Sequence, residues 1–281
     1  MTEQRPLKKW VQKGPLPLQV GYYPMSEAVW RKSLRSPLEF RDVGLHGNSN
    51  GVLNAQHMRA AGGKPGNRAG WFSDDIDMSY VHVMKGELEL ETDKGEKVVL
   101  KRGDTVILPP FNFKRDVFRF TGDFEGLEFT SIGGFALIEK SEKAIGHQLK
   151  PIKTDGVMVN RDKPESYVAG DGPRSFFSYR DTGATEATGG RVHIHIIGIV
   201  DQPPGGTGWH RHTMDQFFMP FTGYLDISVE NLGTVRMTPG DAMYIPAGLR
   251  HDVTSFNKEY TVTEICIPTD YDTIPTDKPT A

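Results

Sequence analysis

Short apolar runs dominate the chain, and glycine or proline interrupts them at short intervals. Four runs show this most clearly, at residues 87–92, 97–100, 105–108 and 192–200. Apolar segments of this length, bounded by turn-forming residues, are typical of β-strands. Helical periodicity is weak except at residues 25–31. The pattern therefore predicts an all-β protein, whose many short strands and regular turns favour small barrels or jelly rolls.

The pattern also occurs twice along the chain. A Phe/Tyr-Arg-Asp-x-Gly segment begins at Phe40 and again at Tyr179, 139 residues later, and Gly103–Asp104 recurs as Gly240–Asp241. Further matches in the same order pair Gly70–Trp71 with Gly208–Trp209, 86–90 with 223–227, and 127–129 with 263–265. Several matches at a nearly constant offset predict a duplicated domain.

The duplication divides the chain into five parts, with a polar linker between the two units. We expect an N-terminal arm at 1–35, a first barrel at 36–138, the linker at 139–173, a second barrel at 174–270, and a C-terminal tail at 271–281. Terminal arms of this kind often pack on a neighbouring barrel or on a second subunit.

Composition excludes several classes of protein. The chain has 281 residues, enough for two domains, and its 33 basic and 36 acidic residues leave no basic excess for nucleic acid or a membrane surface. No apolar run approaches the roughly 20 residues of a membrane span, and the first residues lack the apolar core of a signal peptide. Cys266 is the only cysteine, which excludes an internal disulfide and a thiolate metal cluster. We expect a cytoplasmic protein.

Three histidines carry the candidate chemistry. His210 and His212 stand one residue apart in a strand-like segment, so their side chains point to the same face. His251 follows a glycine turn, an apolar strand and a Pro-x-Gly turn. If the three imidazoles converge, they form a metal site. His193 and His195 are a rival pair on the preceding strand, but no second motif accompanies them, so we interpret them as pocket-lining or surface residues.

The segment around His210 resembles the first motif of the cupin superfamily. That motif is His-x-His, three or four residues, a glutamate and a later glycine, and here His210, His212, Gln216 and Gly223 stand at those positions. Gln216 replaces the glutamate that binds the metal in the family, and a neutral amide binds a metal less strongly. Both a direct ligand and a group that hydrogen-bonds a bound water or substrate are open interpretations of Gln216.

The segment ending at His251 is similar to the second cupin motif. That motif is a glycine, five residues, Pro-x-Gly, two residues and a histidine, and Gly240, Pro246, Gly248 and His251 match every position. Through the duplication the resemblance extends from about residue 36 to 270. It implies a bicupin, with two tandem cupin barrels of the double-stranded β-helix, or jelly-roll, type.

The first unit departs from both motifs. Aligned from Trp71, it has no histidine at any ligand position, and the residues standing there are Phe72, Asp74, Met78 or Ser79, and Lys114 or Arg115. The resemblance therefore implies one divalent metal ion per chain, bound in the second barrel only.

Residues near the motifs are candidates for a substrate pocket, with His193 and His195 among them. Phe218 is in phase with Gln216, so it should point into the barrel. Tyr244 has a polar tip that would reach a substrate, although a place in the barrel core is the simpler interpretation. Arg250 would meet an anion at the barrel mouth, although a solvated arginine is the simpler interpretation.

Glu264 recurs as Glu128 in the unit without histidine ligands. This recurrence favours a structural role over catalysis, such as pairing with Arg180 or Arg41. We interpret the repeated Phe/Tyr-Arg-Asp-x-Gly segments as structural for the same reason, and we assign no catalytic residue beyond the metal site.

Three neutral imidazoles leave the charge of a divalent ion uncompensated, which favours an anionic, bidentate small-molecule substrate. Such sites suit Fe(II), Mn, Ni, Cu or Zn. Three-histidine cupins include iron dioxygenases, so the resemblance implies first an oxidoreductase, a non-heme Fe(II) dioxygenase that cleaves a metal-chelated diketone or hydroxylated aromatic acid. The alternatives are a non-redox isomerase or lyase with the metal as Lewis acid, and a non-catalytic small-molecule-binding cupin. Cupins commonly dimerise, so a homodimer is compatible with the resemblance.

Overall fold

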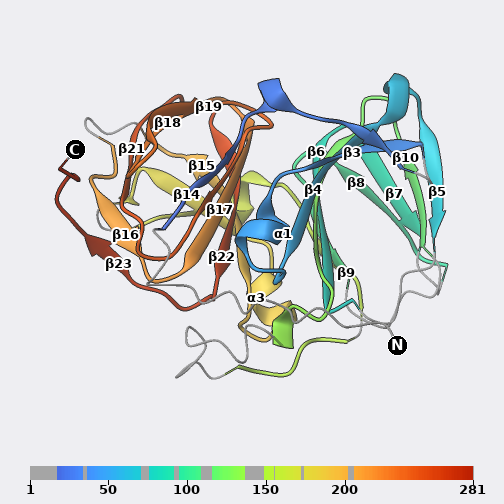
Figure 1. Cartoon of the computed structure of the whole chain (residues 1–281). Coiled ribbons are helices and arrows are strands. Elements are labelled where there is room, and N and C mark those ends of the chain that lie inside the picture. Colours follow the sequence, from blue (N-terminus) through green and yellow to red (C-terminus); the bar gives the residue numbers. More distant parts are fainter. Residues whose placement is uncertain are drawn as a thin grey trace, which may run out of the picture.

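The computed structural model describes residues 18–33, 37–70, 76–91, 95–108, 116–136, 149–154, 156–171, 174–201 and 206–280. Figure 1 shows two β-barrels side by side, the first drawn mainly in teal and green and the second in yellow to red. The prediction of an all-β chain with two tandem jelly-roll barrels is confirmed. None of the helices in these ranges is long and apolar enough to span a membrane.

The first barrel packs a seven-stranded antiparallel sheet on a four-stranded one. The larger sheet has the order β12 (Met158–Asn160), β9 (Thr105–Leu108), β6 (Met78–Lys85), β11 (Glu125–Ser131), β4 (Asn54–Ala60), β3 (Leu38–Asp42) and β2 (Arg31–Lys32). The smaller sheet has the order β5 (Gly66–Gly70), β10 (Asp116–Phe120), β7 (Glu87–Glu91) and β8 (Lys97–Lys101). Short helical turns lie at η1 (Met25–Glu27), α1 (Leu45–Asn48) and η2 (Ala61–Gly63).

The second barrel repeats this plan. Its larger sheet has the order β1 (Gly21–Tyr23), β20 (Ala242–Ile245), β17 (Asp215–Thr222), β22 (Thr261–Ile267), β15 (His193–Ile199), β14 (Phe177–Asp181) and β13 (Val168–Ala169). Its smaller sheet has the order β19 (Gly233–Met237), β18 (Leu225–Val229), β21 (His251–Phe256), β16 (His210–His212) and β23 (Thr273–Pro275). The helical turns are η4 (Pro164–Ser166) and α3 (Ala184–Ala187).

The two barrels exchange strands: the segment that precedes each barrel adds one strand to the sheet of the other barrel. β1, which precedes the first barrel, pairs with β20 of the second, and β12, which precedes the second barrel, pairs with β9 of the first. In Figure 1 the dark-blue segment runs across the top of the molecule from the second barrel to the first. Within the described part of the N-terminal arm, β1 therefore packs on the second barrel, one of the two outcomes expected for the arm.

The two seven-stranded sheets pack against each other, so their central strands are buried on both faces. Residues of β6 are buried from Met78 to Met84, and those of β17 from Gln216 to Pro220. Because strand side chains alternate, one set fills the core between the barrels, where the Phe129 and Phe217 rings lie 5.7 Å apart. The other set points into each barrel, which is how Gln216 and Phe218 reach the interior of the second one.

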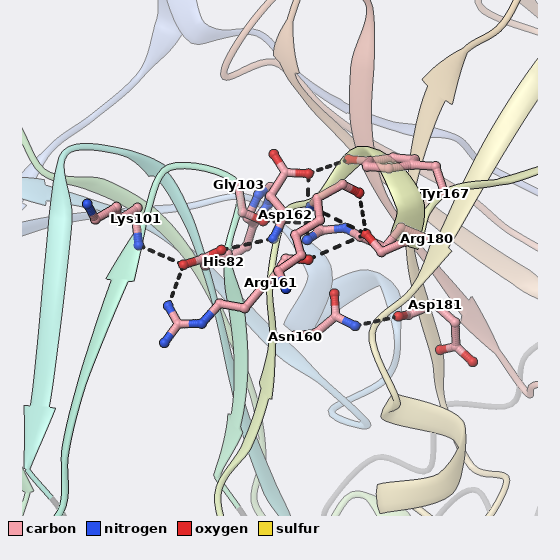
Figure 2. Close-up of polar contacts among 12 residues, drawn as sticks. His82, Lys101, Gly103, Asn160, Arg161, Asp162, Tyr167, Arg180 and Asp181 are labelled. Carbon is pink, nitrogen blue, oxygen red and sulfur yellow. Dashed lines mark hydrogen bonds and ion pairs between the residues drawn. The ribbon is translucent and has the colours of Figure 1, made fainter.

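The repeated Phe/Tyr-Arg-Asp-x-Gly segments hold the two barrels together in an equivalent way. Arg41 donates a hydrogen bond of 2.5 Å to the carbonyl oxygen of Gly240, and Arg180 donates one of 2.5 Å to that of Gly103. Figure 2 shows the second of these contacts, where Asp162 of the linker lies beside Arg180 at 3.7 Å. The structural interpretation of these segments is confirmed, but Arg180 does not pair with Glu264 as expected.

The aspartate and glycine of these segments shape the turn that follows. The N–H of Gly44 bonds to Asp42 Oδ1, and that of Gly183 bonds to Asp181 Oδ1, both at 2.8 Å. Both glycines have a positive φ, 78° and 84°, which side chains with a Cβ rarely adopt. The turn lets α1 and α3 begin directly after β3 and β14.

Candidate metal centre

Two neighbouring strands of the smaller sheet bring the three motif histidines together. His210 and His212 lie on β16 with exposed Arg211 between them, and His210 stands opposite His251 of β21 in the ladder. The N–H of Gly248 bonds to the carbonyl oxygen of His212 at 2.8 Å, so the Pro-x-Gly turn is tied to β16. The two motifs are therefore joined by backbone pairing as well as by their side chains.

The imidazoles converge as the motif spacing predicts. Ring centroids lie 4.4 Å apart for His210 and His251, 4.9 Å for His210 and His212, and 5.2 Å for His212 and His251. One ring nitrogen from each lies within 4.8 Å of the other two. The side chains are buried, with no residue more than 6% exposed.

Hydrogen bonds outside the cluster orient each ring. His210 Nδ1 lies 2.7 Å from the carbonyl oxygen of Gly208, and His251 Nδ1 lies 3.1 Å from that of Leu249. A carbonyl oxygen only accepts, so Nδ1 carries the proton on both rings and the Nε2 lone pair is left for a ligand. His212 Nδ1 lies 3.0 Å from Thr273 Oγ1, so β23 of the C-terminal tail completes the site.

The three rings are held in the neutral form, which is the form that binds a metal. Burial lowers the pKa of each histidine, and the neighbouring imidazoles lower it further for His212 and His251. The pKa of His212 falls to about 3. The donor set is thus three unprotonated nitrogens, which suits a divalent transition metal.

Gln216 enters the same cavity from β17, and its orientation is fixed by Glu264 on β22. The side-chain N–H of Gln216 donates to the Glu264 carboxylate. Because an ionised carboxylate only accepts hydrogen bonds, the amide nitrogen faces Glu264 and the amide oxygen faces away. Gln216 Oε1 is buried and has no hydrogen-bond partner among the described residues. Such an oxygen fits either a metal or a bound water.

Glu264 is held ionised although it is fully buried. Burial alone would raise its pKa, but the charge and hydrogen bond of His195, together with Gln216 and His212, lower it below the usual value. His195 Nε2 lies against the carboxylate, His193 Nε2 lies 2.9 Å from His195 Nδ1, and Thr185 Oγ1 lies 2.8 Å from His193 Nδ1. The rival histidine pair thus belongs to a hydrogen-bonded row that ends at Glu264.

A second group of potential ligand atoms comprises His195, Glu264 and Cys266. It is a poor metal site, because the His195 nitrogen and the Glu264 carboxylate already bond each other. Burial also raises the pKa of the Cys266 thiol well above its usual value, whereas a metal binds the thiolate. The histidine triad is the better donor set.

A cavity of about 520 Å³ in the second barrel has the histidine triad, Gln216 and Glu264 in its wall. Phe218, His193 and His195 line it, as proposed from the sequence. Three lining residues that the motifs did not indicate are Arg174, Tyr179 and Tyr271, the last with its ring edge-on to His212 at 5.6 Å. These three lie outside the two cupin motifs, and Tyr179 begins the repeated segment that was interpreted as structural, so the motif spacing did not identify them.

Two predicted pocket residues lie elsewhere. Tyr244 is part of the apolar core between the barrels, because its strand β20 is covered on both faces. Arg250 is bound to Glu230 through contacts of 3.0 Å and 2.6 Å, on the outside of the cavity. Neither candidate role in the pocket is found: Tyr244 takes the core position that was the simpler interpretation, and Arg250 binds Glu230 away from the cavity lining.

The first barrel differs at the corresponding positions where they are described. Ser79 of β6 stands where β17 has Gln216, and His82 lies between the barrels with Nδ1 2.8 Å from Thr263 Oγ1. Phe72, Asp74, Lys114 and Arg115 lie outside the described residues. Within the described ranges, both groups of potential metal ligands belong to the second barrel.

Comparison with known proteins agrees with this architecture. Residues 198–267 match the cupin domain family. The matched residues lie within the second barrel, from the end of β15 to the end of β22. No curated protein matches it.

Several solved structures share the bicupin fold across nearly the whole chain. A putative glyoxylate-induced protein from Pseudomonas aeruginosa is 12% identical, with a TM-score of 0.66 over 96% of this chain and 94% of that one. An oxalate decarboxylase formate complex from Lactobacillus farciminis is 14% identical, with a TM-score of 0.57 over 94% and 90%. A mutant of Bacillus subtilis oxalate decarboxylase OxdC is 14% identical, with a TM-score of 0.55 over 94% and 80%. At these identities the likeness shows the fold alone.

Proposed function

We propose that this bicupin is an enzyme whose second barrel binds one divalent metal through the Nε2 atoms of His210, His212 and His251. One observation carries the proposal: acceptors or hydroxyl groups of the protein occupy all three Nδ1 atoms, while the rings line a cavity of about 520 Å³. Gln216 Oε1 is the fourth candidate ligand, because it is buried in the same wall without a partner among the described residues. In the alternative, that oxygen holds a water or the substrate.

When bound, a metal such as Fe(II) would supply Lewis acidity and open coordination positions for the oxygens of a small chelating substrate. The protein itself supplies the rest of the site. Phe218 and Tyr271 give apolar surface beside the triad and limit the access of water. Glu264, held by His195, keeps the amide of Gln216 in one orientation.

The reaction we propose first is the oxygen-dependent cleavage of a diketone or a hydroxylated aromatic acid, which makes the protein a non-heme Fe(II) dioxygenase. Support comes from the donor set of neutral imidazoles, which leaves the positive charge of the ion to attract an anionic substrate. Mn, Ni, Cu and Zn suit the same donors, so the identity of the metal is part of the proposal.

A specific observation favours a second candidate, a non-redox lyase or isomerase. The buried His195–Glu264 pair lines the cavity and offers the acid–base group that the motifs alone did not indicate. Solved structures with this fold include oxalate decarboxylases. In this case Glu264, with His195 as its hydrogen-bond partner, would exchange a proton with the substrate while the metal would polarise a carbonyl group.

Metal analysis of protein purified without added metal tests the proposal first. About one equivalent of a divalent ion per chain is expected. Oxygen consumption with iron and a panel of diketones and hydroxylated aromatic acids then separates the two reactions. Uptake of oxygen supports the dioxygenase, and product formation without uptake supports the lyase or isomerase. Protein that retains no metal under any loading condition would contradict both.

A further inference from the structure

Arg174 is the one permanently charged basic side chain among the residues that line the cavity. It stands between β13 and β14, is half-buried, and reaches the same cavity as the three histidines. Two arginines discussed above have partners instead: Arg250 binds Glu230, and Arg180 binds the Gly103 carbonyl oxygen. No ion pair or side-chain hydrogen bond of Arg174 is found among the described residues.

The acidic residues of the cavity do not neutralise this guanidinium. Glu264 is already bonded by His195 and Gln216. Asp171 is exposed, and its contact with Arg174 is between backbone atoms, at 3.3 Å from the Arg174 N–H to the Asp171 carbonyl oxygen. A guanidinium that lines a cavity without a counter-ion is typical of an anion-binding group.

Arg174 and the three histidines line one cavity of about 520 Å³. Tyr179 and Tyr271 line the same cavity, and the Tyr271 ring lies edge-on to His212 at 5.6 Å. An anion bound by Arg174 would therefore lie near the metal ligands.

We propose that Arg174 binds a carboxylate group of the substrate while a second oxygen function of the same molecule faces the three histidines. The inference rests on the proposed function and narrows it. The substrate is a hydroxy or oxo carboxylic acid, and a neutral diketone is excluded. The sequence analysis considered Arg250 for the role of binding an anion, and the proposal assigns that role to Arg174. Arg174 lies in a segment without a cupin motif.

Calorimetric titration with 2-hydroxybenzoate, and with its neutral amide 2-hydroxybenzamide, tests this on zinc-loaded protein. The wild type should bind the acid more tightly than the amide. Arg174→Gln should weaken binding of the acid by about 10- to 100-fold, which corresponds to loss of a charge-assisted hydrogen bond, and should leave amide binding nearly unchanged. Arg174→Lys should lie between the two, because lysine keeps the charge but loses the two-pronged geometry. Arg236→Gln, which removes an exposed arginine bound to Asp226, is the matched control.

Three results would overturn the proposal: no binding of the acid by the wild type, no preference for acid over amide, or equal binding of the acid by Arg174→Gln. Two further measurements, the metal content and a repeat titration of metal-free protein, distinguish failure of the arginine proposal from failure of the proposed function. If the protein holds no metal but Arg174→Gln still loses the preference for the acid, the arginine proposal stands and the metal proposal fails. If metal content is normal and Arg174→Gln changes nothing, the metal proposal stands and the arginine proposal fails.

Discussion

The side-chain amide of Gln216 donates a hydrogen bond to the carboxylate of Glu264, and both side chains are buried on adjacent strands of one sheet. His195 and Gln216 both stabilise the ionised carboxylate, so the pKa of Glu264 stays below its usual value. A residue at position 216 must therefore donate to Glu264. A glutamate, which the cupin motif would place there, would set a second carboxylate beside the first. The departure of this chain from the motif follows from Glu264.

Gln216→Glu should therefore destabilise the metal-free protein by about 3 kcal/mol, because it buries an uncompensated negative charge. Urea unfolding would measure the change. The double variant Gln216→Glu with Glu264→Gln restores one donor and one acceptor, so it should recover most of the loss. A Gln216→Glu protein as stable as the wild type would show that Glu264 is not ionised beside it.

Replacing one imidazole of the triad should abolish metal retention. His251 lies deepest of the three, at 2% exposed, and bonds Leu249 through Nδ1, so His251→Ala removes an oriented ligand that no neighbour replaces. Gln216→Ala should reduce activity with a smaller effect on metal content. His46→Ala, on the exposed surface of α1, is the control and should retain metal as the wild type does. Elemental analysis after dialysis measures all three, and equal metal content in wild type and His251→Ala would refute the ligand assignment.

The sequence predicted most of what depends on local pattern. Strand periodicity and the repeat predicted both barrels, and the motif spacing predicted that His210, His212 and His251 converge, because alternation and a turn of fixed length determine where those side chains point. The candidate pocket roles of Tyr244 and Arg250 are not found in the structure. Tyr244 lies on a strand with a second barrel behind it, which alternation within one strand does not reveal.

Long-range contacts are what the pattern could not predict. The bond between Gln216 and Glu264 joins residues 48 positions apart, and the contact of Thr273 with His212 joins residues 61 apart. Arg174 enters the cavity from a segment between β13 and β14 that has no periodic pattern. These positions follow from how strands are ordered in the sheets, which a single sequence does not encode in its spacing.

The equivalent arginines should contribute to the docking of the two barrels. Arg180→Ala removes a fully buried side chain and leaves the Gly103 carbonyl oxygen without its donor, so a loss of about 3 kcal/mol is expected. Arg41→Ala removes the corresponding bond to Gly240 and should cost somewhat less, because Arg41 is less deeply buried. Calorimetry would detect the loss and a separation of the unfolding of the two barrels. Arg236→Ala, at an exposed pair, should leave the unfolding temperature nearly unchanged, and a similar result for Arg180→Ala would contradict the role given to it.

Acid should destabilise the protein through His82, which is buried between the barrels against Thr263 and the Phe221 ring. Burial and the charges of Arg180 and Arg102 lower the pKa of His82 from 6.5 to about 3. Between these values the unfolded chain binds a proton that the folded chain does not, so stability is lost as the pH falls below 6.5. As the pH falls from about 7.5 to about 5, His82 alone should lower the free energy of unfolding by about 2 kcal/mol. The variant His82→Gln keeps a partner for Thr263 but cannot titrate. Over the same pH interval, the urea-unfolding free energy of the variant should therefore fall by about 2 kcal/mol less than that of the wild type. Other buried histidines, such as His193, leave part of the pH dependence in the variant. Identical losses in the two proteins would show that His82 accepts a proton while the barrels remain docked.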